Sequence, residues 1–270
     1  MGFIPKFYME AIASIGIRSV SGINWIGTGF FVIKKLKDED AYLPFLVTNR
    51  HVIENHDTIV IRLKEKDTGE LKIIDMPLVD NGRKLYSISS DLNIDIAVVS
   101  LNGSYITTNN LEFAAFDIDK HALSSSEFLA KGGDEGAYIY MLGFPMGLVN
   151  VDSNAPICRS GCVARIDLKE IEKTKKFLLD IQNFPGNSGS PIISKPEVVG
   201  IGEGPVLNQS ALIGIIHGYL PYKENLINSQ THEVVEIRSE NSGIAVANPT
   251  EFIRMLVEEE ICRVSSRDIK

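Results

Sequence analysis

Short apolar runs separated by turn residues follow one another along most of the chain. In residues 58–64, Ile59, Ile61 and Leu63 alternate with other side chains in the pattern of a half-buried β-strand. Further apolar runs of strand length lie at 11–17, 27–35, 45–53, 71–79, 95–101, 137–145, 161–168, 176–184, 191–194, 212–220 and 242–249. Many short strands at fairly regular spacing predict an all-β barrel or sandwich.

The C-terminal segment has a different period. After the start signal Pro249-Thr250, the apolar residues Phe252, Met255 and Leu256 recur at helical spacing, which predicts one helix closing the β-protein. A polar stretch at 116–136 separates two halves with about equal numbers of strands. We therefore expect one structural unit at 1–120 and a second at 121–270.

Composition and charge narrow the classes of partner. The 270 residues are 44% hydrophobic and 23% charged, which is ordinary for a soluble globular protein. The net charge of -8 disfavours nucleic acid and anionic membranes, because both attract clustered Lys and Arg. No apolar run approaches the roughly 18 residues of a membrane span.

The N-terminus and the cysteines indicate a reducing compartment. Pro5, Lys6 and Glu10 interrupt the apolar stretch that a signal peptide requires, so we expect a cytoplasmic protein. The odd count of three cysteines favours reduced thiols over a disulfide framework. Cys158 and Cys162 have no matching Cys/His pair elsewhere, and we predict neither a metal site nor a cofactor.

The segment FPGNSGSPII at 184–193 is a candidate site for chemistry. Gly186 and Gly189 flank Ser188 in a loop between apolar runs, which indicates a backbone turned too sharply for ordinary side chains. A serine at such a turn is either a nucleophile or an ordinary turn residue. Credible chemistry requires a base and a group that orients it.

Two other segments supply these groups. His51 follows an apolar strand, and Asp95 opens another apolar run; each alone is commonly structural. Together they give the chain order His, Asp, Ser. An α/β-hydrolase would show Ser, acid, His and a G-x-S-x-G motif, which this chain breaks at Ser190.

Four segments, GTGF (27–30), TNRHV (48–52), DIAVV (95–99) and GNSGSP (186–191), resemble the trypsin-like serine peptidases of the chymotrypsin clan. The chain is most similar to the bacterial HtrA/DegP-like protease domains, which also end in a segment like SGIAVANP followed by a helix. The resemblance extends from about 11 to 258. It implies two six-stranded antiparallel β-barrels, chymotrypsin-like, with a C-terminal α-helix.

The resemblance also implies roles for single residues. Ser188 would attack a peptide carbonyl after passing its proton to His51, and Asp95 would hold the imidazole in the correct tautomer. The backbone N–H groups of Gly186 and Ser188 would form the oxyanion hole. This chemistry needs no metal and no cofactor.

The pattern departs from zymogen-activated relatives at Asn187, where those enzymes carry an aspartate that pairs with a newly cut N-terminus. The chain also has no IVGG-type start. We therefore expect no activation by N-terminal cleavage. We also expect no peptide-binding PDZ module of the kind that HtrA proteins append, because only twelve residues follow residue 258.

Specificity would depend on a pocket formed by Gln182, Ile216, His217 and Gly218. Gln182 would lie at its base, and because it is neutral a strong Arg/Lys preference is not expected. The strand segment IIHGY at 215–219 would line the wall and pair with the substrate backbone as an added strand. His217 has two interpretations: it receives an acidic side chain, as in staphylococcal glutamyl endopeptidases, or it points towards Asp95.

The sequence therefore predicts an intracellular serine endopeptidase whose partner is a protein or peptide substrate. The alternative is a latent or catalytically silent trypsin-like binding or regulatory protein that needs a partner or ligand to order its oxyanion loop. An esterase would use the same residues. The oligomeric state is left open.

Overall fold

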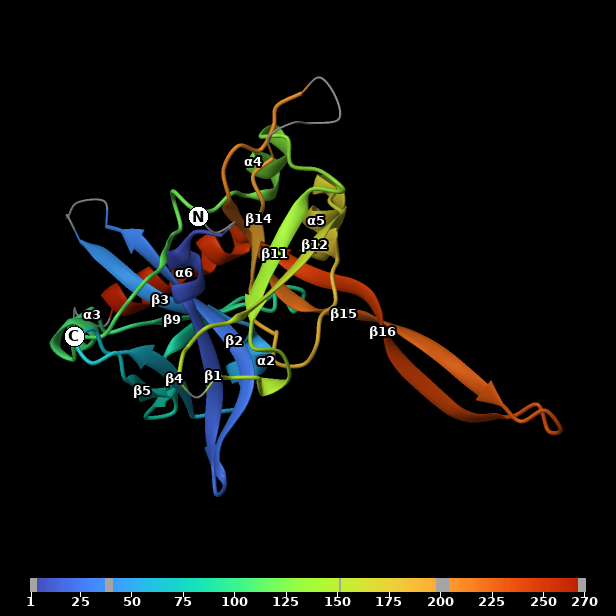
Figure 1. Ribbon diagram of the computed structural model, residues 1–270, viewed down its shortest axis with the longest axis horizontal. Coiled ribbons are helices and arrows are strands. Elements are labelled where there is room, and N and C mark those ends of the chain that lie inside the picture. Colours follow the sequence, from blue (N-terminus) through green and yellow to red (C-terminus); the bar gives the residue numbers. More distant parts are fainter. Residues whose placement is uncertain (1–3, 37–40, 151, 198–203, 267–270) are drawn as a thin grey trace.

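The computed structural model describes residues 4–36, 41–150, 152–197 and 204–266, and it consists of two β-structures packed side by side (Figure 1). The first half contains α1 (Lys6–Glu10), β1 (Ile12–Ser19), β2 (Gly22–Lys35), β3 (Tyr42–Thr48), α2 (Arg50–Ile53), β4 (Thr58–Lys64), β5 (Leu71–Pro77), β6 (Val79–Asp80), β7 (Arg83–Lys84), β8 (Tyr86–Ile88), β9 (Ala97–Ser100), α3 (Gly103–Thr108) and β10 (Phe116–Asp117). The second half contains α4 (Ser125–Ala130), β11 (Tyr138–Gly143), the 3-10 turn η1 (Pro145–Gly147), β12 (Ile157–Arg165), α5 (Leu168–Thr174), β13 (Phe177–Asp180), β14 (Pro191–Ser194), β15 (Ala211–Ile227), β16 (Val234–Pro249) and α6 (Thr250–Ser265).

The first half is an eight-stranded sheet with the order β5-β4-β1-β2-β3-β9-β8, and β10 pairs in parallel with β2. Strand β2 is buried on both faces in its middle because successive side chains enter different cores. Phe30 and Val32 join the core between the halves, whereas Phe31 joins the core enclosed by the first sheet. This explains the continuous apolar run at 27–35.

The second half is a closed barrel of six strands in the order β11-β12-β13-β16-β15-β14. All neighbouring pairs are antiparallel. Its interior is filled by side chains such as Ile139, Leu179, Ile192 and Ile216, all almost completely buried. Closure leaves no free edge within the barrel.

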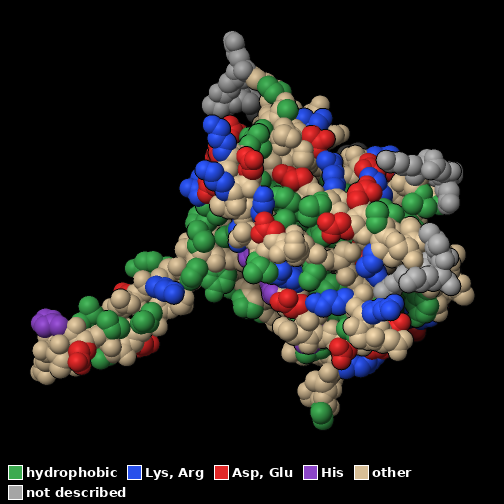
Figure 2. Space-filling model, turned by 180° about the vertical axis from the view of Figure 1, so that it is seen from behind, with side chains coloured by type: hydrophobic (Ala, Val, Ile, Leu, Met, Phe, Trp, Pro, Cys, Tyr) green, Lys and Arg blue, Asp and Glu red, His purple; other side chains and the backbone are tan. Residues whose placement is uncertain are grey.

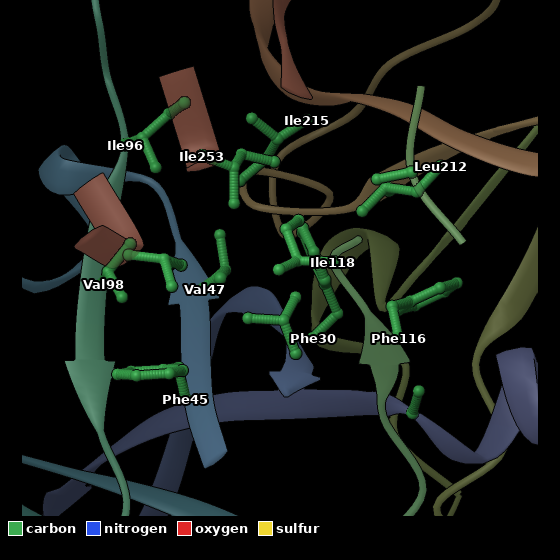
Figure 3. Packing of buried hydrophobic residues seen from close by; sticks show 14 of the residues in the cluster. Phe30, Phe45, Val47, Ile96, Val98, Phe116, Ile118, Leu212, Ile215 and Ile253 are labelled. Atoms are coloured by element: carbon green, nitrogen blue, oxygen red, sulfur yellow. The ribbon is translucent and has the colours of Figure 1, made fainter. Parts of the chain in front are cut away.

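A large apolar core joins the two halves. Phe30, Phe45 and Phe116 from the first half pack in one cluster with Leu212 and Ile215 from the second (Figure 3). Because this core is continuous, the loops of one half are held in fixed positions against the other.

Helix α6 packs against this same core through Ile253, Leu256 and Val257. The helix predicted from the sequence is therefore confirmed, but its buried stripe differs from the expected one. Met255 is exposed, and the buried face continues instead to Glu260. The carboxylate of Glu260 is accommodated by the ion pair with Arg263.

Beyond the barrel, β15 and β16 continue as a two-stranded arm, which we define as residues 219–242. The ladder runs from Pro221 opposite Asn241 to Ile227 opposite Val234. The arm projects far from the rest of the molecule (Figure 1) and carries exposed hydrophobic side chains (Figure 2). The sequence predicted strands only at 212–220 and 242–249, so the arm was missed.

The predicted fold class is confirmed: the protein is all-β, with a C-terminal helix. The second half is the expected six-stranded barrel. The sheet of the first half has eight strands instead of six, because the short strands β8 and β10 join it. Among the described residues, no helix combines the length and hydropathy needed to cross a bilayer.

Candidate active site

The structure joins His51 and Asp95, although they come from different segments. His51 lies on the short helix α2, directly after β3, and Asp95 lies just before β9. The imidazole Nδ1 of His51 is 2.5 Å from Asp95 Oδ2, and the backbone N–H of His51 donates to Asp95 Oδ1 at 3.1 Å. Asp95 is buried and His51 is exposed. Both carboxylate oxygens therefore orient a base whose other nitrogen is accessible.

The backbone of Asp95 is fixed from both halves of the molecule. Its carbonyl accepts hydrogen bonds from Asn49 Nδ2 at 2.6 Å and from the Arg50 N–H at 3.3 Å. Its N–H donates to Oδ1 of Asn248, which is fully buried on β16. Asn248 Nδ2 in turn donates to the carbonyls of Asn93 and Lys175. Asn248 thus ties the loop that carries Asp95 to the second barrel.

His217 is directed towards the same carboxylate. Its Nδ1 is 3.8 Å from Asp95 Oδ2 and 3.4 Å from Asn248 Oδ1. Burial lowers the pKa of His217 below its ordinary value of 6.5, and this effect outweighs the opposing attraction of Asp95. Of the two interpretations of His217, this placement favours the contact with Asp95.

Ser188 lies on the loop between β13 and β14, next to the helix that carries His51. Gly27 separates them: a Cβ built on Gly27 would lie 2.7 Å from Val52 Cγ1 and 3.4 Å from the Ser188 carbonyl oxygen. That carbonyl accepts a hydrogen bond from the Thr28 N–H at 2.9 Å. Within the described part of the chain, Ser188 Oγ and His51 Nε2 are not hydrogen-bonded to each other.

The loop before Ser188 is a turn with Pro185 and Gly186 at its centre. The Asn187 N–H donates to the Phe184 carbonyl at 3.0 Å, and Gly186 has φ +93°. Proline followed by a residue with positive φ is the pattern of a type II turn. The Met146 N–H donates to the Pro185 carbonyl at 2.5 Å, which fixes the orientation of the Pro185–Gly186 peptide.

This orientation leaves two amides free. In a trans peptide the C=O and N–H point in opposite directions, so the Gly186 N–H points away from Met146. Over the described ranges, neither the Gly186 N–H nor the Ser188 N–H has a hydrogen-bond partner. Two unpaired donors beside Ser188 are available to a negatively charged oxygen.

Both glycines around Ser188 are required sterically as well as conformationally. A Cβ on Gly186 would lie 2.4 Å from the Phe144 carbonyl oxygen, and one on Gly189 would lie 2.0 Å from the Thr28 carbonyl oxygen. Gly189 also has φ +88°. The loop is therefore packed tightly against both β2 and η1.

Sequence reasoning missed three residues that hold this loop. Buried Thr28 donates through Oγ1 to the Gly186 carbonyl at 2.7 Å and accepts from the Phe144 N–H. Thr48 Oγ1 donates to the Thr28 carbonyl at 2.7 Å. Met146 has φ 55°, which a methionine rarely adopts. Thr28 lies in the segment GTGF and Thr48 in TNRHV, whereas none of the four segments contains Met146.

The structure separates the four residues expected to form a specificity pocket. His217 and Gly218 line a cavity of about 360 Å³ together with Lys176, Tyr219 and Leu220. Gln182 does not line it; its side-chain amide lies beside Gly243 instead. The side chain of Ile216 is fully buried in the barrel core, and its backbone N–H donates to the Ser190 carbonyl at 2.9 Å.

Known proteins are similar to this chain in sequence family and in fold. A family model described as a trypsin-like peptidase domain matches residues 27–201. The structure of the apo MamO protease domain from Magnetospirillum magneticum aligns with a TM-score of 0.49 and 13% identity, over 93% of this chain and 97% of that one. An inactivated protease paralogue of the scabies mite, SMIPP-S-I1, aligns with a TM-score of 0.50 and 14% identity, over 93% and 96%. A search of curated protein sequences gave no match.

Proposed function

Since the chain belongs to the trypsin-like peptidase domain family, we propose that it is a serine endopeptidase that hydrolyses peptide bonds through Ser188, His51 and Asp95. Family membership confirms the resemblance predicted from the four sequence motifs. A closer relation to the HtrA/DegP-like domains stays a prediction.

The proposed reaction has two halves. Ser188 Oγ attacks the peptide carbonyl while its proton passes to His51 Nε2, and Asp95 stabilises the resulting imidazolium. The tetrahedral intermediate collapses when His51 gives that proton to the leaving amine, which leaves an acyl-enzyme. A water molecule, deprotonated by His51, then attacks the ester and releases the acid and Ser188.

The observation that carries the proposal is the free pair of amides beside Ser188. In the oxyanion hole that we propose, the N–H groups of Gly186 and Ser188 stabilise the negative charge on the former carbonyl oxygen. A collapsed loop would turn the Pro185–Gly186 peptide over and place a carbonyl there. The bond from Met146 to the Pro185 carbonyl supports the open arrangement.

A second candidate is the latent or silent regulatory protein. The observation in its favour is that no hydrogen bond joins Ser188 Oγ to His51 Nε2 in the described part of the chain. Catalytic hydrogen bonds often form only when substrate binds, and we therefore rank the active enzyme first. An esterase would use the same atoms, and we choose peptides by analogy with the family.

We infer the partner class, the location and the activation of the proposed enzyme from its sequence. Its acidic net charge supports a protein or peptide substrate rather than a nucleic acid or membrane partner. We also propose a cytoplasmic location. No N-terminal cleavage would be needed, because Asn187 lacks the carboxylate with which a new N-terminus would pair.

Labelling with a fluorophosphonate probe tests the proposal, followed by cleavage of a complex peptide mixture analysed by mass spectrometry. Wild type should be labelled and should cut peptides. Ser188→Ala should abolish labelling and lower cleavage by about 10⁴-fold or more. Ser104→Ala, at an exposed serine on α3, serves as the matched control and should match wild type.

The outcomes separate the candidates. Labelling without peptide cleavage, but with hydrolysis of a p-nitrophenyl ester, would favour the esterase. A folded wild-type protein that is neither labelled nor active on any substrate would contradict the active enzyme and favour the latent protein.

A further inference from the structure

The arm at residues 219–242 is held to the barrel at its base, where Asn241 Nδ2 donates to the Asn183 carbonyl at 2.5 Å. None of its side chains belongs to the three hydrophobic cores. Strand β15 pairs with β14 only at 211–215, and β16 pairs with β13 only at 244–247, so both edges of the arm are free beyond the barrel. An isolated two-stranded hairpin is marginally stable in water.

The tip of the arm is unusually apolar for an exposed hairpin. Ile227, Val234, Val235 and Ile237 lie close together in the ladder, and each is at least half exposed. Contiguous exposed apolar side chains commonly mark an interaction surface. The arm also carries four acidic and two basic residues, which disfavours an anionic membrane as the partner.

The two edges of the arm are not equivalent. On β15, Pro221 lacks an N–H and cannot donate to an added strand. Residues 221–226 of β15 pair regularly with residues 236–241 of β16, and beyond this ladder the irregularity between Leu226 and Ile227 leaves Val235 of β16 as the extra residue. Residues 236–241 contain neither proline nor glycine. The edge of β16 is therefore the better template for an added strand.

The sequence of β16 is complementary to itself. When two copies pair antiparallel with Ile237 opposite Ile237, Glu236 of each lies opposite Arg238 of the other, and Val235 lies opposite Ser239. Shifting the centre to Glu236 or to Arg238 would instead place like charges opposite each other. Only the first of these registers combines an apolar centre with two ion pairs.

We propose that the arm is a dimerisation element, in which β16 pairs antiparallel with β16 of a second copy about a two-fold axis at Ile237. The pairing is isologous and closes after two copies, because each molecule uses the same edge. It converts two marginal hairpins into one four-stranded sheet, which is the size at which such a sheet becomes stable. It does not depend on the proposed enzymatic activity.

Sedimentation velocity of the full chain tests this inference, over about 1–200 μM because a small interface binds weakly. Wild type should shift from a 29.8 kDa monomer to a dimer as concentration rises. Ile237→Lys, which places two charges at the axis, should remain monomeric. Val20→Lys, at a fully exposed apolar residue between β1 and β2, is the control and should dimerise as wild type does.

Charge reversal tests the register itself. Glu236→Arg and Arg238→Glu should each weaken the dimer at least tenfold, because like charges then face each other across the axis. The double variant E236R/R238E restores opposite charges and should recover wild-type dimerisation. Circular dichroism checks that every variant is folded.

Two results would overturn the proposal. One is a wild type that stays monomeric throughout the concentration range. The other is a dimer that all arm variants retain, which would place the interface elsewhere on the molecule.

Discussion

Two constraints and one free donor meet at Gly186. Its positive φ and the proximity of the Phe144 carbonyl require the absence of a side chain, and its N–H is one of the two unpaired amides. Gly186→Ala should therefore lower kcat by about 10²–10³-fold, the usual cost of losing one oxyanion donor. Steady-state kinetics on a peptide identified for the wild type would measure it.

The control for this variant is Gly204→Ala, where a Cβ would meet no atom within 4 Å and φ is not positive. It should leave kcat unchanged. Wild-type kcat in a folded Gly186→Ala protein would exclude the Gly186 amide from the proposed oxyanion hole.

Asn248 is a positioning residue for Asp95. Asn248→Leu would leave the buried Asp95 N–H without its acceptor and would remove the donor to the partly buried hydrogen bonds with the Asn93 and Lys175 carbonyls. We expect a loss of roughly 2–4 kcal/mol in the free energy of unfolding, since each orphaned buried group costs about 1–3 kcal/mol. Urea titration measures this loss.

Kinetics distinguishes positioning from stability alone. Under conditions in which Asn248→Leu is folded, kcat should still be reduced, because the orientation of Asp95 and His51 has changed. An unchanged kcat would assign Asn248 a purely structural role.

His217 predicts a dependence of stability on pH. Its folded-state pKa lies below 6.5, so below that pH the unfolded chain binds more protons than the folded one. Stability should therefore fall as pH decreases from about 6.5 through the lower folded pKa. The groups facing His217 are Asp95, His51, Lys176 and Asn248, and none of them reverses the direction.

His217→Gln should lose less thermal stability than wild type between pH 7 and pH 5. Part of the acid loss should remain, because burial also lowers the pKa of His121. Differential scanning fluorimetry measures the shift in Tm, with His232→Gln at an exposed position as the control. If the Tm of His217→Gln changed with pH as steeply as that of wild type, His217 would not be a source of the acid destabilisation.

Sequence patterns identified the candidate catalytic residues but not the residues that position them. His51, Asp95 and Ser188 occur in short motifs whose residue types reflect their chemistry. Asn248 and Met146 act through backbone atoms of residues far away in the sequence or in another loop. A contact of that kind leaves no local signal, so only the folded structure identifies it.

At the scale of the element, helix α6 contains a buried charge. Glu260 is fully buried and accepts hydrogen bonds from Ser87 Oγ, the Ser100 N–H and Arg263. Arg263→Ala should cost about 3 kcal/mol of unfolding free energy, because it leaves the carboxylate without its counter-charge. Arg18→Ala, which breaks the exposed pair with Asp75, should lower the unfolding free energy far less.

Urea denaturation of both variants tests the comparison. Equal losses of unfolding free energy in the two variants would indicate that the Glu260 carboxylate is as well solvated as that of Asp75, which would contradict its burial.

The predicted strands were correct where burial imposes a pattern and incomplete where it does not. The runs at 58–64 and 191–194 coincide with β4 and β14. In the arm, Lys223, Glu224 and Arg238 interrupt the apolar positions because both faces are exposed to solvent. Without a buried face there is no alternation to detect, and so the arm could not be predicted.

At the scale of the whole molecule, the shared core predicts that the two halves unfold together. Phe116 is fully buried between them. Phe116→Ala should cost about 3–5 kcal/mol. Fluorescence of the single tryptophan, which lies in the first half, and far-UV circular dichroism should follow one transition in both proteins. Two separate transitions in wild type would show that the halves are independent.

The hydrogen bond between the Asp95 N–H and Asn248 Oδ1 determines when, during synthesis of the chain, Asp95 can reach its final orientation. Asp95 leaves the ribosome long before Asn248, and at about 5–20 residues per second the delay is roughly 8–30 s. During that interval the base is incompletely oriented and Ser188 is still being added. The hydrolytic centre that we propose is therefore complete only after residues 1–247, including its own His51, Asp95 and Ser188, have been synthesised.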